Sequence, residues 1–420
     1  MKHFLSLACA TLLLASLALP AQPPARPRYG DPDFFPITAW GSLPKDIFTQ
    51  EQANDMAEAG ITVAGFAQDI GQLDLVQNAG MVAWGIHQVP GNHYWDDDAP
   101  EEELREGIRA TVRHFKDHPA LLGYFLQDEP STRRFRNLAI MADEVKASHP
   151  GKDCYINLLP NYATQKQMGA PTWKEYAERF IQDLAPAHIG YDFYSLFEED
   201  APLRPGTWRQ LAETREVAQA HGIPFEVCLL SVGHMPYRIP SENDLFFQVY
   251  SALLYGAKGI LYFTYFTPSV ASYRHAPIDP WGNRTETWYA MRFVNNTVKC
   301  IARTINRLDS TKVYHFVPQD RERLPREDAP DETSLVSAPA AENQDIAVGE
   351  FRDRENGDLY VMVLNKNLKH TINISGLQWR NGTPADIQVV SQFKKDVLSR
   401  FAGENVWVAP GQALLLKIQQ

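Results

Sequence analysis

The chain contains few cysteines, and they form no pattern. Of the four cysteines, Cys9 lies in an apolar N-terminal segment, and Cys154, Cys228 and Cys300 are widely separated. Three cysteines at wide spacing argue against a disulfide framework, and the absence of a CxxC pair argues against a zinc site. Cys154 and Cys228 lie in apolar, strand-like segments, so we expect buried free thiols.

The chain also lacks an excess of positive charge, and it has no long apolar run after residue 21. Its formal net charge is −11, whereas a general nucleic-acid binder carries a basic surface. A negative charge is compatible with a neutral substrate such as a glycan. Since no later segment is apolar enough to cross a bilayer, we expect no membrane span.

The first 21 residues have the features of an export signal. Met1-Lys2-His3 is a short basic start, residues 4–19 are apolar, and Pro20-Ala21 ends the run beside small residues. These features predict a cleaved signal peptide over residues 1–21 and a secreted or periplasmic protein. Residues 22–36 are rich in proline, which predicts an extended lead-in.

Short apolar runs alternate with amphipathic helix patterns between residues 37 and 310. Strands that alternate with helices pair in parallel through right-handed crossovers. Eight such units in about 270 residues predict an α/β fold, a closed (β/α)8 TIM barrel that forms the catalytic domain. The eight runs are residues 37–43, 61–67, 81–89, 121–126, 154–159, 189–196, 225–232 and 260–266.

The last part of the chain has a different pattern. Residues 318–345 are polar and rich in proline, which predicts a long loop, and short alternating strands separated by turn signals follow. We therefore expect a small antiparallel β-sandwich over residues 311–420 that braces the barrel. Its predicted strands are residues 347–351, 359–364, 370–374, 387–390, 405–408 and 413–418.

In a TIM barrel the active site lies at the C-terminal ends of the strands. The side chains that follow the apolar runs are amides, imidazoles, carboxylates and aromatic rings, which suit hydrogen bonds to hydroxyl groups and stacking on a sugar. The candidate substrate-binding residues are Trp40, His87, Asn157, Asn161, Tyr162, Tyr194, His234, Tyr262, Tyr265 and Trp281, and the loop after the third run adds Asn92, His93, Tyr94 and Trp95. The histidines show neither HxH nor HExxH spacing, so we expect no metal and no cofactor.

The fourth apolar run ends in Gln127-Asp128-Glu129-Pro130. Two adjacent carboxylates at the mouth of a barrel are costly for the structure, which favours a functional role over capping of the next helix. Glycoside cleavage needs a carboxylic acid that protonates the departing oxygen, and a neighbouring carboxylate raises the pKa of such a group.

Three segments carry a resemblance to a known family. They are the Asp128-Glu129-Pro130 end of strand four, Tyr191-Asp192-Phe193-Tyr194, and the stretch from Pro240 through Gly256 to Phe263. With them, residues 33–310 resemble the barrel glycoside hydrolases of the broad β-glycosidase clan. The resemblance implies an oligo- or polysaccharide substrate, with Glu129 as the general acid/base.

The chain departs from that clan at strand seven. Retaining members carry a nucleophilic glutamate at the end of this strand, where the present chain reads Leu229-Leu230-Ser231-Val232. Three alternatives remain for the second catalytic group. The Asp128-Glu129 pair resembles that of substrate-assisted hexosaminidases, in which the sugar's 2-acetamido group attacks. Otherwise Asp192 is the second carboxylate, or Glu226 reaches the site from deeper in strand seven.

A different class of function fits the same pattern. A barrel without the strand-seven carboxylate is also expected of a catalytically inactive carbohydrate-binding protein. Such a protein binds glycans without turnover, and replacement of Glu129 by glutamine leaves that binding unaffected. Lyase or esterase chemistry lacks support, since the chain has no GxSxG motif.

Overall fold

The computed structural model describes residues 31–419 except 42, 88, 90–98, 116, 199–200, 271, 319–327, 385 and 402–404. The predicted signal peptide and most of the proline-rich lead-in lie outside the described residues. So do Asn92, His93, Tyr94 and Trp95 of the predicted substrate loop. No helix of the described residues is long and apolar enough to cross a membrane.

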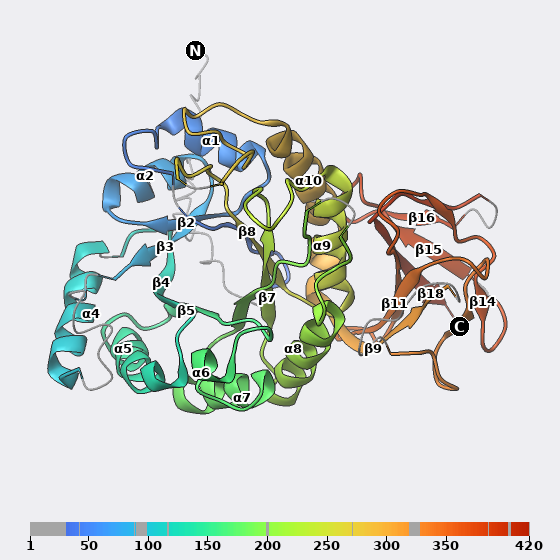
Figure 1. The fold of residues 1–420 in the computed structure, drawn as a ribbon, viewed down its shortest axis with the longest axis horizontal. Coiled ribbons are helices and arrows are strands. Elements are labelled where there is room, and N and C mark those ends of the chain that lie inside the picture. Colours follow the sequence, from blue (N-terminus) through green and yellow to red (C-terminus); the bar gives the residue numbers. More distant parts are fainter. Residues whose placement is uncertain are drawn as a thin grey trace, which may run out of the picture.

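Eight parallel strands form a closed barrel in the order of the sequence, and β1 closes the ring by pairing with β8 (Figure 1). The predicted (β/α)8 barrel is therefore confirmed. Every predicted apolar run overlaps one strand. The strands are β1 (Ile37–Ala39), β2 (Val63–Ala67), β3 (Val82–Ile86), β4 (Leu121–Asp128), β5 (Asp153–Leu158), β6 (Ile189–Asp192), β7 (Phe225–Leu230) and β8 (Gly259–Phe263).

Helices surround the ring of strands and begin at residues that suit helix ends. The side chains of Thr49, Asp69, Thr172 and Ser241 each accept a hydrogen bond from a backbone N–H of the first helical turn. The helices are α1 (Gln50–Glu58), α2 (Ile70–Asn78), α4 (Glu101–Phe115), α5 (Phe135–Ser148), α6 (Gln165–Met168), α7 (Trp173–Leu184), α8 (Thr207–His221), α9 (Glu242–Leu254) and α10 (Glu286–Arg307).

A predominantly antiparallel C-terminal domain follows α10 without a linker, because β9 begins at Leu308 and not after residue 310. Its main sheet has the strand order β16-β15-β18-β12-β11-β9. Two small sheets, β10-β14 and β13-β17, complete the predicted sandwich. The strands are β9 (Leu308–Phe316), β10 (Val336–Ala338), β11 (Ile346–Asp353), β12 (Leu359–Asn365), β13 (Ile372–Asn373), β14 (Gln378–Trp379), β15 (Asp386–Val390), β16 (Leu398–Arg400), β17 (Trp407–Val408) and β18 (Ala413–Gln419).

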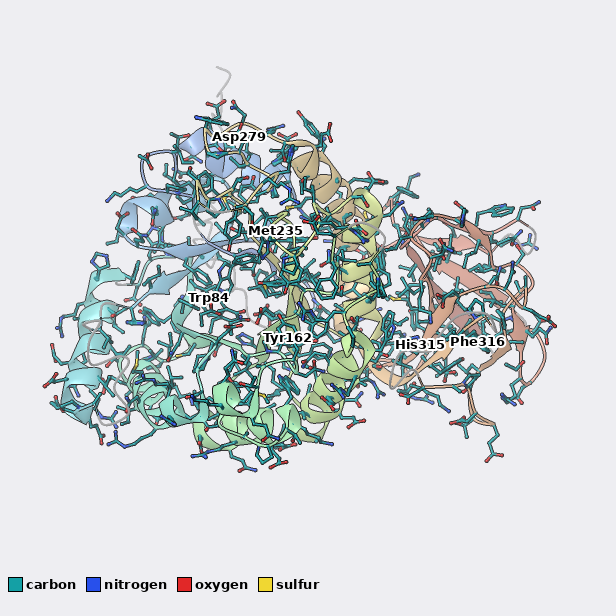
Figure 2. The ribbon with its side chains drawn as sticks, in the orientation of Figure 1. Trp84, Tyr162, Met235, Asp279, His315 and Phe316 are labelled. Carbon is teal, nitrogen blue, oxygen red and sulfur yellow. The ribbon has the colours of Figure 1, made fainter. Side chains whose placement is uncertain are left out.

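The sandwich packs directly against the helices of the barrel (Figure 1). His315, labelled between the two domains in Figure 2, is hydrogen-bonded through Nε2 to the hydroxyl of Tyr255 at 2.9 Å. Gly349 of β11 has no room for a side chain, since a Cβ there would lie 2.7 Å from the carbonyl oxygen of Leu254. A Cβ on Gly411 would lie 2.3 Å from the carbonyl oxygen of Asn243. The two domains therefore meet partly through backbone.

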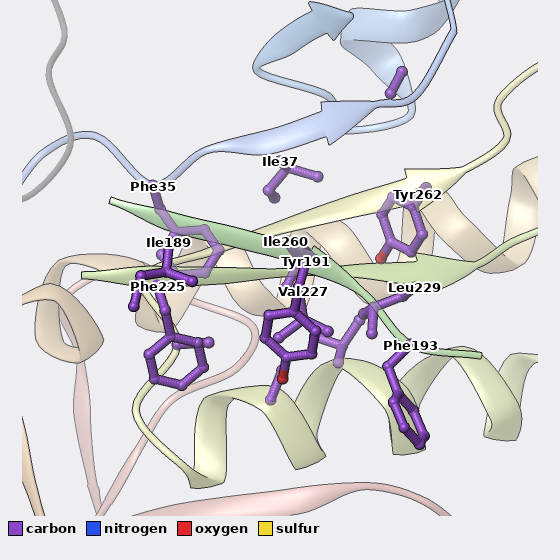
Figure 3. Close-up of a cluster of buried hydrophobic side chains, with 14 of the residues drawn as sticks. Phe35, Ile37, Ile189, Tyr191, Phe193, Phe225, Val227, Leu229, Ile260 and Tyr262 are labelled. Carbon is purple, nitrogen blue, oxygen red and sulfur yellow. The ribbon is translucent and has the colours of Figure 1, made fainter. Parts of the chain in front are cut away.

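Two apolar layers hold the barrel together. The outer layer lies between strands and helices, and Figure 3 shows Tyr191, Val227 and Leu229 directed from their strands toward a helix. The inner layer fills the lumen with Val63, Phe66, Trp84, Leu122, Tyr155, Cys228 and Leu261. Successive strand residues point to opposite faces, so the inner layer fixes which residues of each strand end at the mouth.

Candidate active site

Three carboxyl groups meet at the C-terminal end of the barrel. Asp128 and Glu129 come from the end of β4, and Asp192 is the last residue of β6. Asn157 of β5 lies between them, with its Nδ2 3.0 Å from Asp128 Oδ1 and 3.5 Å from Asp192 Oδ1. The structure therefore brings together the three predicted catalytic residues and one predicted substrate-binding residue.

A shift in strand register aims Asp128 into the mouth. Phe125 pairs with Tyr155 and Asp128 pairs with Asn157, and the register shifts between Phe125 and Gln127. Without the shift, residues three apart would face opposite sides of the sheet. With it, both Phe125 and Asp128 lie beside lumen-facing residues of β5.

Glu129 has an unusual backbone conformation. Its φ angle is 44°, in the left-handed region that side-chain-bearing residues avoid. Its N–H donates to the carbonyl of Asn157 at 2.8 Å, which ties the turn to β5. Such strain of about 1–3 kcal/mol persists where the surroundings enforce it and is concentrated at functional sites.

The carboxyl groups of Glu129 and Asp192 lie close together, and each affects the pKa of the other. Asp192 is 5% exposed, and burial, with the nearby charges of Glu129 and Asp128, raises its pKa well above the ordinary value. Desolvation raises the pKa of Glu129 as well, although Glu129 remains open to solvent at the mouth. Two carboxyls in contact cannot both ionise readily, so this pair retains a proton.

Asp128 is a third weak acid beside this pair. Withdrawal from water raises its pKa to about 6; the amide of Asn157 opposes the rise, and the charge of Glu129 adds to it. Asn157 is 2% exposed, and its Oδ1 accepts a hydrogen bond of 3.1 Å from the hydroxyl of Tyr155. That bond orients the amide so that its N–H groups face the carboxyls. Asn157 is therefore a positioning residue.

Aromatic rings form the floor of the site. Trp40 is half-buried and packs edge-on against Phe66 at 4.9 Å and Phe125 at 5.7 Å. Phe66 and Phe125 are stacked at 4.2 Å. Trp40 is thus partly exposed, as a ring that contacts a sugar has to be.

The wall on the β7 side carries no carboxylate where β7 ends. Leu230 is buried, and Ser231 Oγ donates to the carbonyl of Thr264 at 3.0 Å. Glu226, the third candidate for the second catalytic group, is fully buried near the start of β7, 3.4 Å from His188 Nε2. The suggestion that Glu226 reaches the mouth is wrong, because four residues of strand separate it from Ser231.

An arginine surrounded by aromatic rings forms the wall beyond β6, and the sequence did not single it out. Arg204 lies over the rings of Tyr162 at 4.0 Å and Phe197 at 4.6 Å, and its Nη2 donates to the hydroxyl of Tyr237 at 2.5 Å. Tyr194 lies beside this group, with its ring 5.5 Å from that of Tyr237. Tyr162 is 38% exposed and lies over the ring of strands in Figure 2.

His234 completes this side of the mouth. It is half-buried in the loop after β7, where its ring stacks on Tyr273 at 4.9 Å. Desolvation lowers its pKa, so the imidazole is neutral at neutral pH. The structure thus places the predicted residues Trp40, Tyr162, Tyr194 and His234 around the carboxyls.

Two predicted substrate-binding residues, Tyr262 and Tyr265, are buried between the strands and the helices. The hydroxyl of Tyr262 donates to Asn295 Oδ1 of α10 at 2.8 Å, and its ring belongs to the outer layer (Figure 3). Tyr265 is also fully buried and accepts a hydrogen bond from Trp288 Nε1 at 3.2 Å. Both predictions are wrong because these rings pack between strands and helices, away from the mouth.

Three more predicted contacts are not available to a ligand at the mouth. Both ring nitrogens of His87 are engaged by backbone, at the carbonyl of Leu126 and the N–H of Val89. The Asn161 side chain is turned toward the loop before α8, with its Nδ2 3.4 Å from the carbonyl of Gly206. Trp281 is 80% exposed, but it lies at the outer rim next to Asp279, which Figure 2 places beside α1.

The mouth supplies weak acids, hydroxyl groups, an imidazole and aromatic rings. Desolvation raises the pKa of Asp128 to about 6 and raises the pKa values of Glu129 and Asp192 above their ordinary range, which suits proton transfer by a carboxylic acid, and the rings suit stacking on a sugar. Within the part of the chain that the structure describes, no group of three or more histidine, cysteine or acidic side chains is arranged to hold a metal ion.

No protein-family model matches the chain, and no curated protein sequence matches it. Solved structures do resemble it, and three of them are glycoside hydrolases by name. The β-galactosidase of Bacillus circulans sp. alkalophilus aligns with a TM-score of 0.61 and 10% identity over 91% of this chain and 99% of that chain. A family 39 glycoside hydrolase from Bacteroides cellulosilyticus WH2 aligns with a TM-score of 0.53 and 8% identity, over 93% and 82%.

A third structure, the β-galactosidase of Rahnella sp. R3, aligns with a TM-score of 0.52 and 11% identity, over 65% of this chain and 57% of that chain. This chain thus matches less than two thirds of that enzyme's length. At such identities the likeness establishes the fold, a glycosidase-like barrel with a companion β-domain.

Proposed function

We propose that this protein is a glycoside hydrolase in which Glu129 is the general acid/base. One observation carries the proposal: Glu129 is held in a strained turn at the barrel mouth, beside Asp192, and desolvation raises its pKa. A carboxylic acid that keeps its proton near neutral pH can protonate a departing glycosidic oxygen. The aromatic floor and the tyrosine-rich wall suit a sugar ring above it.

The contact between Glu129 and Asp192 supports a substrate-assisted mechanism. Two-carboxylate glycosidases hold their carboxyls about 5–5.5 Å apart for retention and about 6.5–9.5 Å apart for inversion. Glu129 and Asp192 instead lie close enough for each to shift the pKa of the other, which argues against two independent carboxyls on opposite sides of an anomeric carbon. Asp192 is better placed to hold the shared proton than to attack.

In this mechanism the acetamido oxygen of the substrate bonds to the anomeric carbon as the bond to the leaving group breaks. Glu129 gives its proton to the departing oxygen, and the carboxylate of Asp128 accepts a hydrogen bond from the acetamido N–H. Glu129 then takes a proton from water, whose oxygen bonds to the anomeric carbon and opens the cyclic intermediate. The sugar keeps its anomeric configuration.

The proposed place of action is outside the cytoplasm. It follows from the basic start, the apolar run over residues 4–19 and the small residues at its end. Extracellular or periplasmic glycans would then be the substrates.

A panel of aryl glycosides, half of them with a 2-acetamido group, tests the proposal. We expect turnover of the acetamido sugars and a loss of about 10²–10⁴-fold in Glu129→Gln. Glu51→Gln, on the outer helix α1, is the matched control and should keep full activity. Turnover of plain hexosides alone would contradict the substrate-assisted mechanism. Glycan binding without turnover, unchanged in Glu129→Gln, would instead identify a carbohydrate-binding barrel.

A further inference from the structure

Arg204 is held rigidly beside the active site. Its Nε donates to the carbonyl of Tyr194 at 2.9 Å and its Nη2 donates to the hydroxyl of Tyr237 at 2.5 Å. The rings of Tyr162 and Phe197 lie against the guanidinium at 4.0 and 4.6 Å. A guanidinium fixed in this way has lost most of its conformational freedom before any ligand arrives, which favours binding at the groups still open.

The charge of Arg204 has no carboxylate partner among the described residues, unlike that of its neighbours. Arg274, on the same side of the mouth, pairs with Glu198 at 3.1 Å. Arg238 pairs with Asp244 at 2.5 Å. Partly buried charges are normally paired, because an uncompensated charge out of water is costly. Arg204 uses two of the five N–H bonds that a guanidinium offers, so its remaining donors suit an external anion.

Tyr162 connects this arginine to the reacting groups. The ring of Tyr162 lies 4.0 Å from the guanidinium of Arg204 and 5.5 Å from the ring of Phe193, the residue after Asp192. Burial raises the pKa of the Tyr162 hydroxyl; the charges of Asp192 and Tyr237 add to the rise, and the charge of Arg204 opposes it. Tyr162 is therefore close to both Arg204 and Asp192. A sugar over the carboxyls would place its neighbour, or its own ring substituents, near the guanidinium.

We propose that Arg204 determines specificity for an acidic glycan, by binding a carboxylate on the sugar that is cleaved or on its neighbour. That this glycan is cleaved rests on the proposed glycosidase function. The anion subsite itself requires only that the glycan binds. The planar guanidinium, stacked between rings, presents its edge, and a planar carboxylate matches an arginine edge with parallel hydrogen bonds. A uronic acid residue next to a 2-acetamido sugar has the required chemistry.

Binding to the Glu129→Gln protein tests this subsite without depending on turnover. The probes are a methyl disaccharide of a uronic acid and a 2-acetamido sugar, and the same disaccharide with its carboxylate reduced to a neutral hydroxymethyl group. Isothermal titration calorimetry should show that the acidic probe binds about tenfold or more tightly than the neutral probe. When Arg204→Gln is combined with Glu129→Gln, this preference should be abolished. Arg204→Lys in the same background keeps the positive charge and should retain part of the preference.

Arg274→Gln is the matched control, since it removes a positive charge at the same rim that is already paired with Glu198. It should leave the ratio of the two affinities unchanged. Equal affinity for the two probes, binding of neither, or a preference that survives Arg204→Gln would overturn the proposal. Equal affinity would mean that Arg204 serves the protein's own carboxylates, with Glu199 and Asp200 nearest in the sequence.

Tighter binding of a sulfated analogue than of the uronic acid would overturn the carboxylate assignment. The two proposals fail separately. Carboxylate-dependent binding with no turnover of any glycoside would contradict the proposed glycosidase function and support the anion subsite. Turnover with no carboxylate preference would do the reverse.

Discussion

The carboxyl groups of Glu129, after β4, and Asp192, at the end of β6, lie against each other at the mouth of the barrel. Burial raises the pKa of both groups, so the pair holds one proton at a pH where free carboxylic acids have lost theirs. The proton that Glu129 would give to a leaving group is thus stored between two strands.

Asp128→Asn should narrow the pH range of activity from the alkaline side. The charge of Asp128 raises the pKa of Asp192, so its removal lowers the pH at which the pair loses its shared proton. The alkaline limb of the kcat/KM profile should therefore move to lower pH, and kcat should fall about 100-fold if the substrate is misplaced. Asp143→Asn, on the exposed face of α5, should change neither. An alkaline limb that stays in place would show that Asp128 does not act on the pair.

Asp192→Asn should stabilise the protein increasingly as the pH rises. An aspartate in the unfolded chain ionises near 3.8, whereas burial raises the pKa of folded Asp192 well above that value. Below about pH 4 both states keep the proton, and above it only the unfolded state ionises freely, so stability falls with rising pH. The variant lacks this loss, and its Tm advantage over the wild type should grow between pH 4 and pH 7. An advantage that is constant with pH would contradict the assignment.

Glycine at position 129 should be more stable than alanine, which reverses the usual order. Glycine adopts a φ of 44° without strain, whereas alanine keeps the penalty of about 1–2 kcal/mol. At Lys299, exposed in the middle of α10, alanine should instead exceed glycine by about 1 kcal/mol. Urea denaturation of the four variants measures both differences. Glycine below alanine at position 129 would show that the turn is relaxed.

Tyr262→Phe should lower stability and leave kinetics unchanged. The hydroxyl of Tyr262 donates to Asn295 between β8 and α10, and its loss should reduce the free energy of unfolding by about 1 kcal/mol or more. Tyr162→Phe is the matched comparison at the mouth and should alter KM or kcat with little loss of stability. A change in KM in Tyr262→Phe would show that Tyr262 contacts the substrate.

The barrel could be predicted from the sequence because its signals are local and repeated. Short apolar runs, helix caps such as Ser241 and glycine stops such as Gly222 mark each unit. Strand β9 went unpredicted, since it follows α10 directly with no turn residue to announce it. Strand ends also located the catalytic candidates, since Asp128, Glu129, Asn157 and Asp192 all lie within one residue of the C-terminal end of a barrel strand.

The direction of a side chain was harder to predict than its position along the chain. Tyr262 lies near the end of β8, yet it faces the helices, and Asp128 faces the lumen only because of a register shift in β4. Residues in loops had no strand to aim them. Arg204 and Tyr237, which come from the segments after β6 and β7, meet only in the folded chain.

The close approaches at Gly349 and Gly411 place the backbone of the sandwich against α9, the helix that follows β7. A methyl group at Gly411 would collide with the carbonyl of Asn243 in the first turn of α9, and a methyl group at Gly349 would collide with the carbonyl of Leu254 at its last residue. The β-domain is therefore not a separable module. It supports the side of the barrel that carries the wall of the mouth. The barrel and the β-domain should therefore unfold in a single thermal transition.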